Sequence, residues 1–403
     1  MFTGRPEMKR PMNPIDDQYL MNVTSRPQVV MTHGKGSYLW DNCGKKYLDF
    51  IQGWAVNALG HCPAELCEAL VIQAQLLVTP SPALHNAPQL ELAKRLAELS
   101  GLDQTHFSST GAEANEVAVK LARKWGRTQG NGAYEIITTH GAFHGRTLAM
   151  MAASGKPGWD RLFPPAPGGF RHVAYGDVAA AAQAITSHTV AIMVEPIQGE
   201  AGVVVPPRGY LRELRQLADD HNILLIFDEI QTGMGRTGTL FAYQAHQVLP
   251  DILTLGKGLG AGFPISATLA REQVCCFEQG DQGGTFNGNP LAAAVANTVL
   301  TSVTAPGFLA HVIEMGSYLH ERLWKLAETR KFKQIRGKGL LWAVDMGSDI
   351  AAAVRDTAFE QGLIINAARP SVLRLMPSLR VTVEEIDEAI ACLDESLTSV
   401  TAA

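Results

Sequence analysis

The sequence of 403 residues lacks the features that mark several large classes of protein. It has no extended run of Lys or Arg, and its formal net charge is −5, whereas a nucleic-acid-binding face is usually basic. No apolar stretch reaches about 18 residues, the length that a membrane-spanning helix requires. Residues 1–14 carry charge and are not followed by an apolar segment, so no secretory signal is expected. We therefore expect a cytoplasmic protein that binds neither nucleic acid nor a membrane.

Cysteine is scarce and irregularly spaced. The six cysteines match no zinc-binding pattern, and the adjacent Cys275 and Cys276 are poorly placed to bridge each other or to bind one metal ion. Reduced thiols packed as small apolar side chains are the simpler interpretation. The sequence therefore predicts neither a disulfide framework nor a metal site.

Two common patterns for binding nucleotides are missing as well. The sequence G-x-x-x-x-G-K-[ST] of phosphate-binding loops does not occur. The spacing Gly256-x-Gly258-x-x-Ala261 resembles the dinucleotide fingerprint, but that fingerprint must open a helix. Here Pro264 and a strand-like run follow instead, so we reject a dinucleotide site.

What the chain does have is enough apolar material for a large core. Apolar residues make up 46% of the chain and charged residues 18%, a composition that excludes general disorder. At roughly 100–200 residues per domain, the length corresponds to two or three domains.

The middle of the chain alternates between apolar, β-branched runs and helical patterns. Such runs, buried on both faces, predict an α/β fold with a mainly parallel sheet covered by helices. The expected strands are residues 134–138, 190–194, 223–227, 252–255 and 265–269. The expected helices here include residues 86–100, 112–125 and 209–221.

The two ends of the chain show a different pattern from the middle. Residues 1–30 predict an irregular arm and residues 37–50 a β-hairpin. After about residue 300 a smaller α/β unit is indicated. Its expected helices are 308–331, 349–361 and 383–397, and its expected strands are 340–345, 363–366 and 372–376. With a boundary near 295–305, we divide the chain into an arm that includes part of the small domain (1–60), a large domain (61–300) and a C-terminal small domain (301–403).

Three of the expected strands end in ionisable residues. Glu195 follows the run 190–194, Asp228 and Glu229 follow 223–227, and Lys257 follows 252–255. In an open parallel sheet, ligands bind beyond the carboxyl ends of the strands, so these side chains should meet in one crevice. A single polar residue at a strand end is usually an ordinary terminus, but a lysine and carboxylates together favour a site.

Lys257 lies between glycines in the segment DILTLGKGLGAGFP. The glycines leave room for a bulky group beside the lysine. Burial in such a pocket disfavours the ammonium form and lowers the pKa of the amine. The neutral amine is a nucleophile for a carbonyl carbon, with which it forms a Schiff base.

A phosphate site is indicated by the polar turn Ser108–Asn115, which leads directly into the helix expected at 112–125. Free N–H groups and the helix dipole at such an end favour an anion, although a simple N-cap is the alternative interpretation. Together with Lys257 and Asp228, this turn points to pyridoxal phosphate. An acidic partner keeps the ring nitrogen of that cofactor protonated, and the protonated ring accepts electrons from the substrate carbon.

The segments around these residues resemble the class III aminotransferases of fold type I, and among them the acetylornithine aminotransferases most closely. The resemblance covers nearly the whole chain, in order and at similar spacing. Its segments are GKGSYLWDNCGKKYLDF, AVNALGHC, STGAEANEVAVKLAR, AFHGRT, VEPIQGEAGV, FDEIQTGMGRTG, LGKGLGAGFPI, GGTFNGNPLA and VLRLMPSL. It implies a mainly parallel seven-stranded sheet in a large domain, a smaller α/β domain, and pyridoxal 5'-phosphate as the cofactor.

The resemblance implies specific roles around the cofactor ring. Lys257 would bind the cofactor covalently and then act as the base in a 1,3-proton shift, and Asp228 would pair with the pyridinium nitrogen. Gln231 would lie near the 3′-oxygen of the ring, and Phe143 would stack on the ring. We interpret His144 beside it as a structural residue.

The same resemblance implies how phosphate and a second subunit are held. The backbone N–H groups of Gly111 and Ala112 would bind the phosphate. Thr285 would reach the phosphate of a neighbouring subunit, which implies a homodimer with shared active sites, and Gly284 would touch the substrate across that interface.

Three further residues are implied in substrate binding. Arg146 would hold the substrate α-carboxylate, a task that suits the bidentate guanidinium group. Glu200 and Arg374 would form a gate: paired for the amino donor, and separated so that Arg374 binds the distal carboxylate of 2-oxoglutarate or glutamate. The sequence assigns no role to Trp54, Arg369 or Arg380.

The implied reaction is transfer of the terminal amino group of N2-acetylornithine to 2-oxoglutarate in arginine biosynthesis. Ornithine, succinylornithine, succinyl-diaminopimelate and 4-aminobutyrate stay open as donors, because a few methylene groups are worth only about 1–3 kcal/mol of discrimination. Two hypotheses of another class are a racemase or aminomutase on the same fold, and a binding protein without activity. The gate argues against the first, and the presence of Lys257 with Asp228 against the second.

Overall fold

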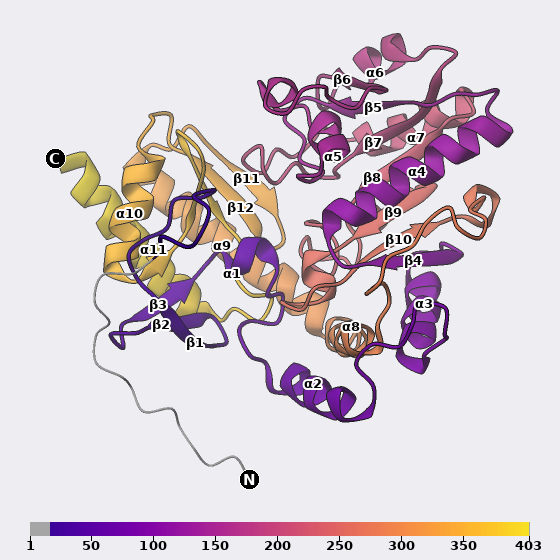
Figure 1. Ribbon diagram of the computed structural model, residues 1–403. Coiled ribbons are helices and arrows are strands. Elements are labelled where there is room, and N and C mark those ends of the chain that lie inside the picture. The colour runs from indigo at the N-terminus through magenta and orange to yellow at the C-terminus, as the bar shows by residue number, and fades with distance from the viewer. Residues whose placement is uncertain (1–16, 403) are drawn as a thin grey trace.

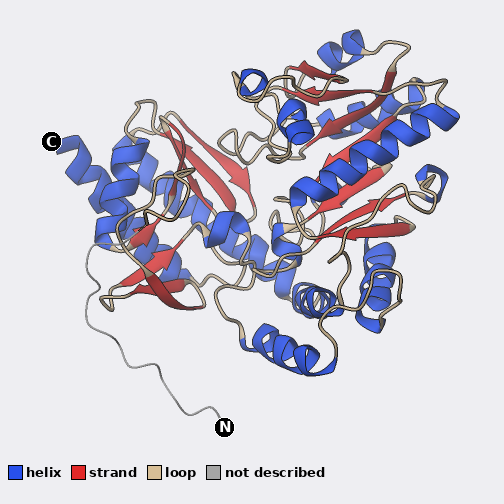
Figure 2. Ribbon diagram, in the orientation of Figure 1, coloured by secondary structure: helices blue, strands red, loops and turns tan. Residues whose placement is uncertain are grey.

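The computed structural model describes residues 17–402 (Figures 1 and 2). Figure 2 shows a large twisted sheet with helices around it and, beside it, a smaller group of strands and helices. Residues 17–30 contain no helix or strand, as expected for the arm, and residues 1–16 of that arm lie outside the described part of the chain.

The large sheet contains seven strands. Their bounds are Gln104–Ser108 (β4), Glu135–Thr139 (β5), Phe170–Val173 (β6), Thr189–Val194 (β7), Leu224–Asp228 (β8), Ile252–Leu255 (β9) and Ser266–Ala270 (β10). The order across the sheet is β4-β10-β9-β8-β7-β5-β6. Strands β6, β5, β7, β8 and β9 are parallel, and β10 is antiparallel to both of its neighbours. The predicted mainly parallel seven-stranded sheet is confirmed.

Helices cover both faces of this sheet. On β8, Leu224 and Ile226 pack in the cluster that includes helix α4 (Gly111–Gln129), whereas Leu225 and Phe227 pack in the cluster that includes α7 (Tyr210–Asp220). Figure 1 shows α4 running across one face of the sheet. The strict alternation explains why these strands read as continuous apolar runs in the sequence.

Further helices surround this sheet. Their bounds are Gln52–Ala55 (α1), Ala64–Leu76 (α2), Ala87–Ser100 (α3), Leu148–Ala153 (α5), Val178–Ala184 (α6) and Pro290–Val303 (α8). Helices α2 and α3 both pack against α8, below the β4 side of the sheet in Figure 1.

The smaller part contains two four-stranded sheets and three long helices. One sheet has the order β11-β12-β15-β14, and the other has the order β1-β2-β3-β13. The strands are Met31–Lys35 (β1), Tyr38–Asp41 (β2), Lys46–Asp49 (β3), Gln334–Lys338 (β11), Leu341–Asp345 (β12), Leu363–Ile364 (β13), Asn366–Arg369 (β14) and Val372–Leu375 (β15). The helices are Phe308–Arg330 (α9), Ala351–Gln361 (α10) and Val383–Ala402 (α11).

N-terminal strands therefore join the C-terminal part of the chain. Strand β3 pairs in parallel with β13, and the expected hairpin at 37–50 is formed by β2 and β3. The domain boundaries near residues 60 and 300 stay predictions.

Several elements differ from those expected, for physical reasons. Strands β4 and β6 were not anticipated because they form the two edges of the large sheet and carry polar residues, as edge strands commonly do. Helix α8 is buried on nearly all sides and therefore lacks an amphipathic period. The single strand expected at 363–366 is instead two strands, β13 and β14, which belong to different sheets.

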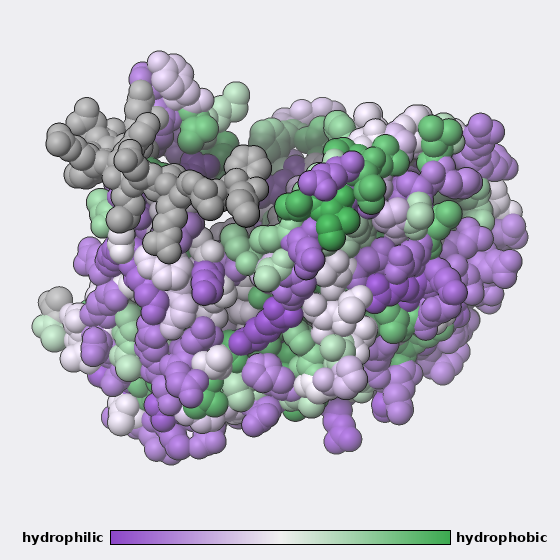
Figure 3. All heavy atoms as spheres, turned by 90° about the horizontal axis from the view of Figure 1, so that it is seen from below, coloured by the Kyte–Doolittle hydropathy of each residue, from purple (hydrophilic) through white to green (hydrophobic). Residues whose placement is uncertain are grey.

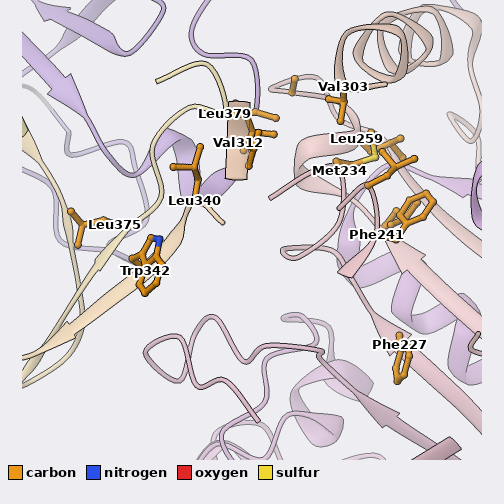
Figure 4. Close-up of a cluster of buried hydrophobic side chains, with 14 of the residues drawn as sticks. Phe227, Met234, Phe241, Leu259, Val303, Val312, Leu340, Trp342, Leu375 and Leu379 are labelled. Atoms are coloured by element: carbon orange, nitrogen blue, oxygen red, sulfur yellow. The ribbon is translucent and has the colours of Figure 1, made fainter. Parts of the chain in front are cut away.

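One continuous apolar core connects the two parts of the molecule. Figure 4 shows members from both parts, including Met234, Phe241 and Leu259 around the large sheet, Leu340 just before β12 and Leu375 on β15. The C-terminal sheet is therefore held at a fixed place relative to the strands of the large sheet.

Within residues 17–402 no single helix is long and apolar enough to cross a membrane. One pair of helices, α8 with α9, satisfies the criterion of length and composition only when taken together, and it is bent by 70°.

Candidate active site

A cavity of about 420 Å³ lies where β7, β8 and β9 end. Most of the predicted site residues line it, whereas Gly284, Thr285 and Arg374 do not. The lining residues are Thr110, Gly111, Ala112, Phe143, His144, Gly145, Arg146, Thr147, Glu195, Glu200, Asp228, Ile230, Gln231 and Lys257.

Strand alternation decides which carboxylates face this cavity. Met193 and Ile226 lie on the α4 face of the sheet, and two residues further along their strands Glu195 and Asp228 reach the cavity from the same face. Glu229 is one residue further along, so its side chain points to the opposite face of the sheet and does not line the cavity. All three carboxylates were expected at strand ends, but only Glu195 and Asp228 face the cavity.

The Asp228 carboxylate accepts three hydrogen bonds. Asn115 Nδ2 and His144 Nδ1 lie 2.8 Å from its Oδ2, and the Ile230 N–H donates to its Oδ1 at 3.0 Å. Asn115 is itself oriented by the Thr254 hydroxyl, which donates to its amide oxygen at 2.7 Å. The aspartate is thus held in one orientation and keeps accepting capacity on the cavity side.

The contacts of Asn115 and His144 with Asp228 were not predicted from the sequence. A carboxylate only accepts, so the Nδ1 of His144 must carry the proton of this bond. His144 is therefore more than a core residue, because it touches the side chain predicted to hold the cofactor ring. A signal was available for Asn115: it follows Gly111 by four residues and therefore lies on the same face of α4.

Glu229 has a structural task on the other side of the sheet. Its two carboxylate oxygens accept the backbone N–H groups of Ala242 and Tyr243 at 2.6 and 2.8 Å. Burial raises the pKa of Glu229 to about 7, against the opposing effect of these hydrogen bonds.

Lys257 begins a short 3₁₀ turn, Lys257–Leu259, directly beyond β9, and its φ is +40°. Its amine makes no hydrogen bond or ion pair within residues 17–402. Burial lowers the pKa of Lys257 below its ordinary value of 10.5, although the charge of Glu200 acts in the opposite direction. The direction is the one expected from the sequence, and it favours a neutral, nucleophilic amine.

Helix α4 presents free N–H groups to the cavity. Thr110 is its N-cap, and a capping box joins Thr110 and Glu113, whose carboxylate also accepts the N–H of Ser109. The N–H groups of Gly111 and Ala112 remain without a partner in the described part of the chain. This is the arrangement that binds a phosphate at a helix N-terminus.

Gln231 lies on the wall between the cavity and Arg374. Its Oε1 is 3.5 Å from Arg374 Nη1, and its Nε2 is buried without a partner among the described residues. A Cβ at position 199 would come within 1.5 Å of Gln231 Oε1, so glycine there leaves room for the amide in this orientation.

Arg374 and Glu200 form an ion pair of 2.8 Å at the edge of the cavity. Arg374 lies on β15 and is 0% exposed, and Asn366 Oδ1 accepts from its Nε at 3.1 Å. The Glu200 side chain is 26% exposed. Burial alone would raise the pKa of Glu200, but the charges of Arg374, Lys257 and Lys156 and the hydrogen bond from Arg374 together outweigh it, and the pKa is lowered. One nitrogen of Arg374, Nη2, has no partner in the described chain.

Two aromatic rings and two cations lie together at one side of the cavity, which we call its rim, and of these Phe143 and Arg146 line the cavity. Phe143 and Trp159 meet edge to face with centroids 6.0 Å apart. The Arg146 guanidinium lies 5.9 and 5.2 Å from these two rings, and the Lys156 amine lies 4.6 and 4.9 Å from them. Neither cation has an acidic partner within residues 17–402, so the rim favours an anion.

Glu195 is the second carboxylate inside the cavity. Its Oε2 accepts the N–H of Phe143 at 3.2 Å. Burial raises the pKa of Glu195 well above its ordinary value, and the nearby Asp228 raises it further. Both effects favour the protonated form of this carboxyl group, against the Phe143 N–H and the Lys257 charge, which favour the ionised form.

The other residues singled out in the sequence lie elsewhere. Gly284 and Thr285 are exposed, outside the cavity of their own chain. Trp54 lies under Arg374, whose guanidinium is 5.5 Å from the indole ring. Arg369 donates to the Ala201 carbonyl at 3.4 Å and Arg380 pairs with Glu65, so both have local partners.

Pyridoxal phosphate fits this set of groups. The unpaired amine of Lys257 suits its aldehyde, the free N–H groups at the start of α4 suit its phosphate, and the unpartnered Gln231 Nε2 suits an anionic ring oxygen. The fixed Asp228 carboxylate suits a protonated ring nitrogen. Fold and site together define a pyridoxal-phosphate enzyme of fold type I.

Comparison with known proteins identifies the family. The family model of the class-III aminotransferases matches residues 20–397, and the chain belongs to this family. Acetylornithine aminotransferase 2 of Bordetella bronchiseptica is 51% identical over 384 residues, which cover 94% of this chain and 97% of that protein. The acetylornithine aminotransferase of Ralstonia nicotianae is also 51% identical, with 93% and 96% covered.

Solved structures share the fold closely. The ornithine aminotransferase of Toxoplasma gondii ME49 superposes with a TM-score of 0.92 at 36% identity, covering 96% of this chain and 94% of that chain. The N-acetylornithine aminotransferase of Stenotrophomonas maltophilia K279a has a TM-score of 0.83 at 37% identity, with 96% and 98% covered. The protein is therefore a pyridoxal-phosphate-dependent aminotransferase, which uses an amino donor and a keto acid.

Proposed function

We propose that this aminotransferase moves the terminal amino group of N2-acetylornithine to 2-oxoglutarate. The products are N-acetylglutamate 5-semialdehyde and glutamate, as in arginine biosynthesis, and we place the reaction in the cytoplasm. The observation that carries the proposal is the Glu200–Arg374 pair beside Lys257. The names of the relatives at 51% identity support the choice of donor.

Residues from the short turn at Lys257, the start of α4 and two connecting segments would hold the cofactor. Lys257 would bind it covalently through Nζ, the N–H groups of Gly111 and Ala112 would bind its phosphate, and Gln231 Nε2 would donate to its 3′-oxygen. Phe143 would stack against its ring. When bound, pyridoxal phosphate supplies an aldehyde for amines and a protonated ring that accepts electrons from the substrate carbon.

Asp228 keeps the ring nitrogen protonated through its carboxylate. The Asn115 amide and the His144 imidazole orient that carboxylate from behind, at 2.8 Å each. Once released from its covalent bond, the Lys257 amine takes the proton from the substrate carbon and returns it one position away. Its lowered pKa leaves a larger fraction of the amine neutral, and therefore able to accept a proton, than in an exposed lysine.

The gate allows one cavity to take two kinds of substrate. Arg146 binds the α-carboxylate of the acylated donor at the rim. While Glu200 is paired with Arg374, the arginine charge is neutralised. A donor whose distal end is an amine is then not repelled from the inner end of the cavity. When Glu200 leaves, Arg374 offers Nη1 and the already unpartnered Nη2 to the distal carboxylate of 2-oxoglutarate.

We also propose that the active enzyme is a homodimer. Thr285 and Gly284 lie on the surface, outside the cavity of their own chain, and would complete the cavity of a second copy. Large apolar side chains are also exposed on α2 and α3, among them Val71, Ile72, Leu76 and Leu90. Figure 3 shows apolar side chains gathered on the lower face, where α2 lies in Figure 1. Exposed patches of this kind mark protein interfaces.

Ornithine is the second candidate donor. The observation that favours it is the TM-score of 0.92 with the ornithine aminotransferase of Toxoplasma gondii ME49. Free ornithine differs from the acylated donor by an α-ammonium group, which would meet the unpaired cations Arg146 and Lys156 at the rim. Repulsion between like charges at that rim supports the acylated donor.

The test is a panel of amino donors with the holoenzyme. N2-acetylornithine alone should convert the bound cofactor to its pyridoxamine form and release one semialdehyde per site, and 2-oxoglutarate should then restore the starting spectrum. We expect kcat/KM for N2-acetylornithine to exceed that for ornithine by at least about tenfold. A higher value for ornithine would contradict the proposed donor, and racemisation without any keto acid would contradict transamination.

A further inference from the structure

Lys156 is an unused cation that lines a neighbouring pocket and borders the active-site cavity at Phe143. Its amine lies over the Phe143 ring, which lines the cavity, and over Trp159, but these rings do not neutralise its charge. It makes no hydrogen bond or ion pair within residues 17–402. The side chain is half-buried, and a partly desolvated cation without a partner is unfavourable. An anion is therefore expected to approach it at some stage of the reaction.

The acidic group with the strongest influence on Lys156 is Glu200. Burial lowers the pKa of the Lys156 amine, and the charge of Glu200 opposes this more than that of any other group. Glu195 acts less strongly, and it already accepts the Phe143 N–H. The remaining charges that act on Lys156 are the cations Arg369 and Arg146.

Glu200, in turn, has three cations within electrostatic reach. Arg374, Lys257 and Lys156 all lower the pKa of this carboxyl group, against burial, which would raise it. In the proposed reaction, Arg374 must release Glu200 in order to bind the keto acid, and Lys257 is engaged with the cofactor. A largely buried carboxylate that loses its partner is strongly destabilised unless another cation replaces it. Arg146 is assigned to the substrate α-carboxylate in the proposed function, so of the cations that act on Glu200 Lys156 is the one left for this task.

We propose that Lys156 is the second partner of Glu200. The Glu200 carboxylate pairs with Arg374 while the amino donor is bound, and it pairs with Lys156 while the keto acid occupies Arg374. This inference rests on the gate in the proposed function and extends it. Lys156 is thus a positioning residue, which affects the keto acid through Glu200 and does not touch it.

The surrounding structure favours a rotation of one side chain over a movement of the loop. The loop that carries Glu200 is closed by two backbone hydrogen bonds between Gln198 and Val204, of 3.1 and 2.9 Å. Arg374 is anchored on β15 and held by Asn366. Glu200 is the more exposed member of the ion pair and is free of any other hydrogen bond within residues 17–402, so it is the partner that moves.

The first test separates the two half-reactions. In Lys156→Gln we expect kcat/KM for 2-oxoglutarate with the pyridoxamine form to fall at least about tenfold, and that for N2-acetylornithine with the pyridoxal form to change less than about twofold. Lys156→Arg should restore most of the loss. Arg161→Gln removes a cation from the same loop, with a side chain that is 89% exposed, and should leave both half-reactions unchanged.

The second test asks whether Lys156 acts through Glu200. In a Glu200→Gln background the carboxylate that needs a second partner is absent, so Lys156→Gln should have an additional effect below about twofold. The same tenfold loss in both backgrounds would show that Lys156 binds the keto acid directly and would overturn the proposal. An equal loss in both half-reactions of the single variant would overturn it as well.

A third measurement is structural. In a crystal structure of the holoenzyme with glutarate, an unreactive dicarboxylate, the Glu200 carboxylate should lie within about 4 Å of Lys156 Nζ. A Glu200 that stays on Arg374 or turns to solvent overturns the proposal. The Arg374→Ala variant shows which of the two proposals fails. If the gate itself is wrong, Arg374→Ala slows both half-reactions equally. If only the role of Lys156 is wrong, Arg374→Ala still slows the half-reaction with 2-oxoglutarate more than the one with N2-acetylornithine.

Discussion

Lys257 illustrates how its position changes the chemistry of an ordinary side chain. Its place beyond β9, its positive φ and the glycines around it put an unpaired amine into a buried cavity. Burial disfavours the ammonium form, and this residue therefore acts as a nucleophile at a pH where a surface lysine would not.

This lowered pKa has a measurable consequence. Only the neutral amine bonds to an aldehyde, so the rate at which the apoenzyme binds pyridoxal phosphate covalently should rise with pH. Because the pKa lies below the ordinary value of 10.5, the midpoint of that rise should lie below 10.5 as well. Borohydride trapping at timed intervals across about pH 6–10 measures it, and a midpoint at or above that of free lysine would contradict the burial argument.

A second prediction at this scale concerns the buried arginine. Arg374→Ala should lower kcat/KM for 2-oxoglutarate by about a hundredfold, because a charge-assisted contact to its distal carboxylate is worth about 2–5 kcal/mol. N2-acetylornithine, whose distal end is an amine, should lose less than about fivefold. Steady-state kinetics with each substrate varied in turn checks this, with Arg355→Ala on α10, where the side chain is 43% exposed, as the control. Equal losses for both substrates would remove the gate.

At this scale the sequence predicts some site residues and not others, for identifiable reasons. Lys257 and Asp228 could be found because each ends an apolar run. The contact of His144 with Asp228 could not, since the two residues are 84 positions apart and only the folded sheet brings them within 2.8 Å. The role of Lys156 depends in the same way on a loop that folds over Phe143.

At the scale of elements, the parallel strands arrange the site. The apolar runs of β7, β8 and β9 were predictable because both of their faces are buried. The edge strands β4 and β6 carry polar residues and gave no such pattern. The division of 363–366 between two sheets depends on the tertiary pairing of β13 with β3, which local sequence does not encode.

The start of α4 supplies a prediction about an element. Thr110→Ala removes the hydroxyl that accepts the Glu113 N–H, and it should lower the free energy of unfolding of the apoenzyme by about 1 kcal/mol. Thr128→Ala near the other end of the same helix removes only hydroxyl bonds to preceding carbonyls and should cost less than about 0.5 kcal/mol. Urea unfolding followed by circular dichroism compares the two. Equal effects would argue against the capping box as the stabilising feature.

At the scale of the whole molecule, the proposed dimer would complete the active site of each chain. The exposed apolar residues of α2 and the surface position of Thr285 both suggest that a second copy covers this face. Exposed apolar side chains at such density are unusual on a monomer.

A charge on this face should therefore separate the subunits. Leu76→Asp, at a side chain that is 74% exposed, should shift the protein from dimer to monomer at micromolar concentration and lower activity with it. Trp324→Asp on α9, 59% exposed, should leave the dimer intact. Light scattering after size-exclusion chromatography measures the mass. A Leu76→Asp protein that stays dimeric and active would place the interface elsewhere.

The most direct measurement is the identification of the lysine that carries the cofactor. The holoenzyme would be reduced with borohydride, digested and analysed by mass spectrometry, with Lys257→Ala as the control. We expect the phosphopyridoxyl group on Lys257 alone in the native protein, and neither a label nor turnover in the variant. A label on another lysine, or full turnover in Lys257→Ala, would contradict the mechanism.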